Sequence, residues 1–328
     1  MTTKVLSWGL LSTANINEAL IKPLRASKRN RLTAVASRSQ DKADAYAKKW
    51  RIEKAYGSYE ALLADPAVDV IYNPLPNHLH AEWTIKALQA GKHVLCEKPF
   101  AMTLAEVDAM LAAQENSERV LAEAFMYRHH PQTLKVKELV EGGAIGRLQL
   151  IRGSFTFNID HEVDIRLDPT KGGGAIWDVG CYPISYARLI AGKDPVSVYG
   201  RQVIGTKSGV DESFYGLLNF PNNVYAEFDC GFRSPHRQHM EIVGTAATIT
   251  VPVPFKPGED ETISLYTEKK TEAVKIKPQE LYIGEVEDMA DCILSGKAQR
   301  MSLADSKGNI ATILALIESA KSGRPVAL

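Results

Sequence analysis

The first third of the chain alternates short apolar runs with segments of helical periodicity. The apolar runs predict strands, and segments whose apolar residues recur every three or four positions predict helices. Strands are expected at 4–8, 32–36, 68–72, 93–96 and 119–124, and helices at 16–24, 41–50, 59–64, 81–90 and 103–114. Thr103 and Glu106 form a capping-box pattern at the start of the last helix. Nearly uninterrupted apolar strands that alternate with helices predict a parallel sheet covered on both faces.

The pattern changes after about residue 147. Ile151, Phe155 and Phe157 alternate with polar residues, as expected for a strand with one buried face. Further strands are expected at 196–204, 213–220, 224–232, 239–244, 248–251 and 262–266, and helices at 175–190, 285–295 and 303–321. Strands followed by helices predict an α+β domain with a large open, mostly antiparallel sheet. We therefore expect an α/β protein with domains at 1–124 and 125–328, whose C-terminal helices can pack back on the first domain.

Composition narrows the range of partners. The 328 residues include 39 Lys plus Arg and 39 Asp plus Glu, so the net charge is zero, which argues against nucleic acid as the main partner. No apolar run reaches the roughly 18–20 residues of a membrane span, and the first residues lead directly into a strand without a signal peptide. The four cysteines include no CxxC pair. These features predict a cytoplasmic protein with a small-molecule substrate.

The segment after the first strand stands where a dinucleotide-binding loop belongs. It consists of Gly9, Leu10, Leu11, Ser12, Thr13, Ala14, Asn15 and Ile16. Ser12 and Ala14 replace glycines of the usual pattern, but small residues still let the backbone approach a pyrophosphate, and the helix N-terminus supplies amide donors. An ordinary strand–turn–helix connection is an equally good interpretation of this segment alone.

The end of the second strand bears on cofactor choice. A site that selects NAD usually places an acidic residue there to bind the ribose 2′-hydroxyl. This chain has Ser37 and Arg38, with Lys42 one helical turn later. Arg38 can form a charge-assisted contact with a 2′-phosphate, to which Ser37 can also donate. The position therefore favours NADP, with NAD as the weaker candidate and a solvated basic turn as the alternative.

The loop after the third expected parallel strand lies at a strand's carboxyl end, where open α/β sheets bind ligands. Its residues Leu75, Pro76, Asn77 and His80 are candidates for cofactor contact. His78 and His80 have the spacing of metal ligands, but no third ligand with fitting spacing is evident. We therefore expect no metal here, and a helix N-terminal loop with satisfied polar groups is the alternative.

The segment 90–99, which ends in Glu97-Lys98-Pro99, resembles the Gfo/Idh/MocA oxidoreductase family. The segments 76–80 and 172–182 support this resemblance, which covers essentially the whole chain. Ser12-Thr13-Ala14 and the segment 123–128 are similar to the branch of NADP-dependent D-xylose 1-dehydrogenases and dimeric trans-dihydrodiol dehydrogenases. The resemblance implies an N-terminal Rossmann dinucleotide-binding domain. It also implies a C-terminal domain that binds substrate and forms a homodimer or homotetramer through its sheet.

The resemblance further implies that Lys98 is an active-site residue and that Tyr182 transfers the proton. A free tyrosine has a pKa near 10, and a nearby ammonium and the oxidised nicotinamide favour its phenolate. Lys98 can also hydrogen-bond the reacting oxygen. Asp178 and Tyr182 are four residues apart and share one face of a helix. Asp178 can bind a substrate hydroxyl or orient Lys98, or it can simply stabilise the helix dipole.

Further candidates come from the segments around these motifs. Glu97, Arg128 and Trp177 are candidates for cofactor binding, and Tyr127 and Arg166 for substrate binding. Trp177 equally suits a hydrophobic core, and Arg166 a solvated loop. The expected function is NADP-dependent hydride transfer to or from a carbohydrate or cyclic diol, of the aldose 1-dehydrogenase or sugar ketone reductase type. The alternative is a dinucleotide-binding regulator without turnover, a class that tends to lose the lysine–tyrosine pair.

Overall fold

The computed structural model describes residues 4–161 and 163–328, and these form two compact units. The first comprises the described residues up to His129 together with Tyr282–Ser306, and the second comprises His130–Leu281 with Lys307–Leu328. The sequence predicted a domain boundary after residue 124. In the structure the first unit extends to His129 and also includes Tyr282–Ser306 from the C-terminal part of the chain.

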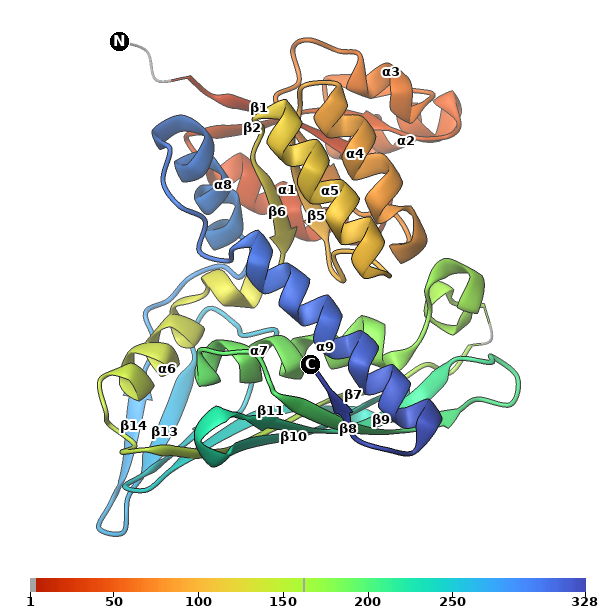
Figure 1. The fold of residues 1–328 in the computed structure, drawn as a ribbon. Coiled ribbons are helices and arrows are strands. Elements are labelled where there is room, and N and C mark those ends of the chain that lie inside the picture. Colours follow the sequence, from red (N-terminus) through yellow and green to blue (C-terminus); the bar gives the residue numbers. More distant parts are fainter. Residues whose placement is uncertain (1–3, 162) are drawn as a thin grey trace. The chain divides into compact units, whose positions relative to one another are not determined.

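The first unit contains a six-stranded parallel sheet in the order β3-β2-β1-β4-β5-β6, which confirms the predicted Rossmann sheet (Figure 1). Its strands are β1 (Leu6–Leu11), β2 (Asn30–Ala36), β3 (Lys54–Tyr56), β4 (Val70–Asn73), β5 (His93–Glu97) and β6 (Leu121–Ala124). Its helices are α1 (Asn17–Ala26), α2 (Gln40–Trp50), α3 (Tyr59–Leu63), α4 (His80–Gln89), α5 (Leu104–Ser117) and α8 (Ile283–Ser295). The strand order reverses between β1 and β4, and ligands bind at such a switch point in open α/β sheets.

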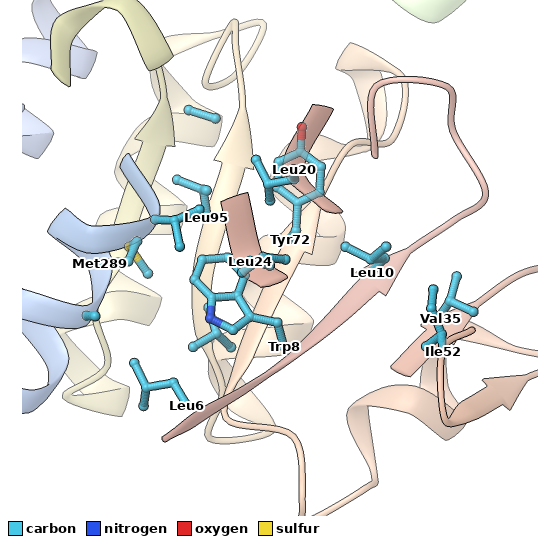
Figure 2. Close-up of a cluster of buried hydrophobic side chains, with 14 of the residues drawn as sticks. Leu6, Trp8, Leu10, Leu20, Leu24, Val35, Ile52, Tyr72, Leu95 and Met289 are labelled. Atoms are coloured by element: carbon cyan, nitrogen blue, oxygen red, sulfur yellow. The ribbon is translucent and has the colours of Figure 1, made fainter. Parts of the chain in front are cut away.

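The core of the first unit joins residues that are far apart in the sequence. Figure 2 shows that Trp8 of β1 belongs to a buried cluster that also contains Leu24 of α1 and Met289 of α8. The Trp8 indole donates to Asn30 Oδ1 at 2.8 Å, so its polar atom is satisfied inside the core. Because α8 packs against α1, this late helix completes the face of the sheet that α1 begins to cover.

The second unit contains a nine-stranded sheet in the order β14-β13-β12-β11-β7-β10-β9-β8-β15. Only the pairing of β7 with β10 is parallel among the described pairs, so the predicted mostly antiparallel sheet is confirmed. The strands are β7 (Leu148–Asn158), β8 (Ser197–Ile204), β9 (Asp211–Phe220), β10 (Val224–Gly231), β11 (Arg233–Gly244), β12 (Thr248–Val251), β13 (Thr262–Tyr266), β14 (Thr271–Lys275) and β15 (Val326–Ala327). The longer helices are α6 (Pro131–Glu141), α7 (Cys181–Ala191) and α9 (Leu303–Ser322), which begins in the first unit.

The two faces of this sheet differ. In Figure 1, α6 and α7 lie on one face, and α9 joins them, where Ser319 Oγ accepts from the Gly200 amide of β8 at 3.0 Å. No helix of the described residues lies on the opposite face (Figure 1). Tyr215 of β9 is 51% exposed there, and Leu217 and Tyr225 are each 41% exposed. This face therefore exposes large apolar side chains in the isolated chain, beside the ion pairs of Arg152 with Glu227 and Glu241.

Candidate active site

The loop after β1 has the backbone shape of a dinucleotide-binding turn. β1 continues to Leu11, and Ser12 follows with φ of +99°, a conformation that glycine usually supplies. Ser12 Oγ accepts from the Ala14 amide at 3.2 Å, and the Ser12 carbonyl accepts from Asn17 Nδ2 at 2.8 Å. Asn17 thus closes the turn from the third glycine position of the G-x-G-x-x-G spacing, which is the signal that could have singled it out.

Gly9 has a different place from the one expected. It lies buried inside β1, and a Cβ atom there would approach Leu62 Cδ1 of α3 at 2.9 Å. This glycine therefore allows α3 to pack closely on the strand, and its contact with the cofactor stays a prediction. Thr13 and Ala14 are partly exposed, and Asn15 and Ile16 are exposed, so these four remain accessible to a ligand.

The end of β2 presents unpaired positive charge. Arg38 and Lys42 are both exposed, and neither side chain makes a hydrogen bond or ion pair within the described parts of the chain. Ser37 is buried, and its amide donates to the Tyr56 carbonyl at 2.9 Å, which fixes the backbone just before Arg38. A guanidinium without a counter-ion at this position fits an additional phosphate on the ribose.

The loop after β4 is tied to the turn that follows β5. His80 is 1% exposed, and its Nδ1 and Nε2 atoms each lie 2.7 Å from a backbone carbonyl oxygen, of Pro99 and Leu75 respectively. Burial lowers the pKa of His80 to about 4. The neutral ring lies between the two loops and has one N–H to donate to one of these carbonyls, and a contact of His80 with the cofactor stays a prediction. Leu75 is also buried, whereas Pro76 and Asn77 are partly exposed.

Lys98 stands directly after β5, at the carboxyl end of the parallel sheet, and is partly exposed. Glu97 Oε2 accepts from the Lys98 amide at 3.2 Å, and Glu97 Oε1 accepts from the hydroxyl of Tyr72 in β4 at 2.5 Å. Burial raises the pKa of Tyr72 well above its usual range, so this phenol remains a hydrogen-bond donor. Glu97, expected at the cofactor, thus also braces the turn that carries Lys98.

The residues after β6 lie in the interior. Tyr127 is 0% exposed, and its ring meets Phe125 edge-on with ring centroids 5.7 Å apart. Arg128 is also buried and forms an ion pair with Asp305. The structure gives each of these residues partners within the first unit, and their expected roles at the substrate and cofactor site stay predictions.

The helix that carries Asp178 and Tyr182 begins irregularly. Residues Ile176–Gly180 form a π-helical turn before α7, where the sequence predicted a plain α-helix, and such turns are frequent at functional sites. Asp211 of β9 accepts from the Ile176 amide at 2.7 Å, and burial raises the pKa of this carboxyl to about 7. Gly174 makes room for it, because a Cβ atom there would lie 2.2 Å from Asp211 Oδ1.

Two predicted substrate residues meet in the second unit. Arg166 Nε donates to Asp178 Oδ2 at 2.8 Å, and the Asp178 carboxylate raises the pKa of Arg166. Asp164 also lies 3.2 Å from the Arg166 guanidinium, which stands 5.8 Å from the centre of the Phe157 ring. The Arg166 side chain is 42% exposed, so the pair is open to solvent on one side.

Tyr182 lies in an aromatic environment. It is 3% exposed, and its ring centroid is 5.3 Å from that of Phe155 and 5.5 Å from that of Phe255. Trp177, one turn earlier, is also buried. Because Lys98 belongs to the first unit and Tyr182 to the second, their pairing stays a prediction.

Comparison with known proteins identifies the family. Residues 6–125 match the model of the oxidoreductase family with an NAD-binding Rossmann fold, and residues 133–250 match the GFO/IDH/MocA C-terminal domain. The chain is 36% identical to D-xylose 1-dehydrogenase (NADP(+)) 2 of Haloferax volcanii, over 98% of this chain and 99% of that protein. It is 33% identical to trans-1,2-dihydrobenzene-1,2-diol dehydrogenase of Xenopus laevis, over 96% of each.

A solved structure agrees with these relatives. KijD10, a 3-ketoreductase from Actinomadura kijaniata in complex with NADP and TDP-benzene, superposes with a TM-score of 0.91 at 28% identity, covering 96% of this chain and 98% of that one. The similarity extends through both compact units. The chain therefore belongs to the Gfo/Idh/MocA family of oxidoreductases, as its sequence motifs indicated.

Proposed function

We propose that this protein catalyses NADP-dependent hydride transfer to or from a carbohydrate or cyclic diol, as an aldose 1-dehydrogenase or a sugar ketone reductase. The observation that carries the proposal is Lys98, which follows β5 at the ligand-binding edge of the sheet on a turn braced by Glu97 and Tyr72. The relatives support the substrate class, since they are named for xylose, dihydrobenzenediol and keto-sugar substrates.

The cofactor choice rests on the end of β2. Arg38 is exposed there and makes no hydrogen bond or ion pair within the described residues. No acidic residue stands at 37–39 to bind an unmodified ribose. NADP is named for the Haloferax volcanii enzyme and is bound in the KijD10 structure, in agreement with this assignment.

The proton transfer falls to Tyr182 and Lys98. A nicotinamide cofactor, when bound, supplies or accepts the hydride. Tyr182 then takes the proton from a substrate hydroxyl or returns it to a carbonyl oxygen. Lowering the pKa of a tyrosine from about 10 by about 2–3 units needs about 3–4 kcal/mol from a nearby cation, the role that we assign to Lys98. Lys98 also stabilises charge on the reacting oxygen.

Substrate recognition falls to the Arg166–Asp178 pair. The guanidinium carries donors and the carboxylate acceptors, so together they match the hydroxyl groups of a sugar or diol. The 2.8 Å bond between them keeps both groups oriented before substrate arrives. Asp178 lies in the π-helical turn, four residues before Tyr182, and Arg166 reaches it from the 3-10 turn Ile165–Leu167.

The open face of the nine-stranded sheet is proposed as the contact with a second copy of the chain, in a homodimer or homotetramer. Tyr199, Tyr215 and Leu217 line a crevice of about 570 Å³ on the sheet together with charged side chains such as Arg201 and Glu227. Exposed apolar surface of this kind is characteristic of association sites.

A cytoplasmic location is proposed from two further features. None of the described helices has the length and apolar character needed to cross a membrane. The four cysteines are free and buried, as expected in a reducing compartment.

A substrate panel tests the proposed function. The purified protein is incubated with aldoses, keto-sugars and cyclic diols, with NADP or NAD and their reduced forms, and absorbance of the reduced nicotinamide is followed. We expect turnover with at least one carbohydrate or diol, faster with NADP, and a large loss in the Tyr182→Phe variant. NADP binding without turnover on any substrate would contradict the proposal and favour the alternative, a dinucleotide-binding regulator without turnover.

A further inference from the structure

The turn that carries Lys98 is held from two sides by buried side chains of other elements. On one side, His80 of α4 lies 2.7 Å from the Pro99 carbonyl oxygen. On the other side, Glu123 Oε1 of β6 accepts from the Phe100 amide at 3.0 Å. Backbone groups of the two residues that follow Lys98 are thus each engaged by a side chain from a distant part of the sequence.

Glu123 is a buried acidic residue in strand β6. It is 2% exposed, and burial raises the pKa of its carboxyl to about 8, although the Ser306 hydroxyl, the Phe100 amide and Arg128 act in the opposite direction. A buried carboxyl group is unfavourable unless its hydrogen bonds compensate. Packing alone would be served by an apolar residue on this strand. We therefore attribute the presence of a carboxyl group here to its oxygen Oε1, which holds the Phe100 amide.

The role follows from the chemistry of lysine. Its four-carbon stem is flexible, so the position of the ammonium depends on how firmly the backbone at its base is fixed. A misplacement of about 1 Å can lower a rate by about 100-fold. We propose that Glu123 is a positioning residue for Lys98, which it serves by holding the Phe100 amide through Oε1. This inference rests on the role assigned to Lys98 in the proposed function.

Two conservative variants separate the reach of the acceptor oxygen from the ability to titrate. Glu123→Gln loses the titratable group but keeps an acceptor oxygen at the same length, whereas Glu123→Asp keeps a carboxyl group but withdraws the oxygen by one methylene. We expect Glu123→Asp to lower kcat by about tenfold or more, and Glu123→Gln to stay within about threefold of wild type. A proton-transfer role for Glu123 predicts the opposite order, because the amide cannot titrate.

Two readouts besides turnover accompany these variants. Hydrogen exchange of the peptide that contains residues 97–101 should accelerate in Glu123→Asp and not in Glu123→Gln, because only the former loses the bond to Phe100. Binding of the reduced cofactor, followed by fluorescence, should change by less than about twofold in both. Thermal melting shows that each variant is folded.

A double-mutant cycle with Lys98→Ala tests whether Glu123 acts through Lys98. If Glu123 acts through Lys98, adding Glu123→Asp to Lys98→Ala should lower the residual kcat by less than about twofold. An equal loss in both backgrounds would overturn the positioning role and leave the proposed function standing. Full turnover in Lys98→Ala alone would overturn the proposed function and this inference with it.

Discussion

Arg166 and Asp178, which the sequence nominated separately, form one ion pair, with Arg166 Nε donating to Asp178 Oδ2 at 2.8 Å. The pair joins a short 3-10 turn, Ile165–Leu167, to the π-helical turn before α7. Neither group then meets substrate as an isolated charge. The pair should instead behave as one recognition element whose two members depend on each other.

This dependence predicts non-additive effects. Arg166→Met and Asp178→Asn should each lower kcat/KM, because a hydrogen bond to a charged group is worth about 1.5–3 kcal/mol, roughly a 10- to 100-fold change. The double variant should be little worse than either single one. Steady-state kinetics on the best substrate measure all three. The exposed Lys270–Glu272 pair provides the control, and additive effects at Arg166 and Asp178 would show that they act separately.

Cofactor preference should depend on Arg38. Replacing it with alanine removes a charge-assisted contact worth about 1.5–3 kcal/mol and should reduce the preference for NADP over NAD by about tenfold or more. Lys42→Ala is the matched control, because Lys42 is equally exposed but one turn away, and it should have a smaller effect. The ratio of kcat/KM values for the two cofactors is the measurement. An unchanged ratio in Arg38→Ala would refute this assignment.

The buried carboxyl of Glu123 should make stability depend on pH. Its pKa is raised from 4.5 to about 8 in the folded state, so between these values the folded chain binds the proton and the unfolded chain releases it. Stability is therefore fully present below about pH 4.5 and is lost as the pH rises toward about 8, by about 1.4 kcal/mol per unit.

Glu123→Gln cannot ionise and should escape this loss. Its free energy of unfolding relative to wild type should rise between about pH 5 and pH 8 in urea titrations. Glu60→Gln, at an exposed position, should show no such trend. A constant difference between Glu123→Gln and wild type would mean that Glu123 is ionised in the folded protein.

The open sheet face should govern assembly. Leu217→Arg places a charge among exposed apolar residues and should dissociate the oligomer, whereas Leu134→Arg, on exposed α6, should not. Light scattering at micromolar concentration reports the mass of each. A wild-type monomer under these conditions would contradict the proposed contact.

The parts of the fold that sequence predicted well are those with a strong local signal. The capping box at Thr103 is confirmed, with its Oγ accepting from the Glu106 amide at 3.1 Å. By contrast, β14 was missed because Thr271–Lys275 is a mostly exposed edge strand with little apolar pattern. α6 was missed as well, although His130 caps it and Pro131 starts it.

The candidate site shows the same difference between features with a local sequence signal and features without one. Motif spacing nominated Lys98, Asp178 and Tyr182, whose roles stay predictions. The position of Gly9 inside β1 was not evident from the sequence, because the end of β1 depends on pairing with its neighbouring strands rather than on local pattern. The π-helical turn depends on Asp211, a long-range partner that no local signal reveals. Buried partners such as these follow from tertiary packing, which a single sequence does not display.

The role of Tyr182 is tested most directly by the pH dependence of turnover in wild type and Tyr182→Phe. The substitution removes the hydroxyl but keeps the ring that packs on Phe155 and Phe255. Lys98→Ala should be at least as damaging, and the two effects should not add, because both residues act on one proton.

In this measurement, wild-type oxidation should rise through an apparent pKa well below that of free tyrosine, about 10. Tyr182→Phe should lose that limb and about 10²–10⁴ in kcat. Its affinity for the cofactor, measured by fluorescence, should change far less. A Tyr182→Phe enzyme that keeps most of its turnover and the same pH profile would contradict the assignment of proton transfer to Tyr182.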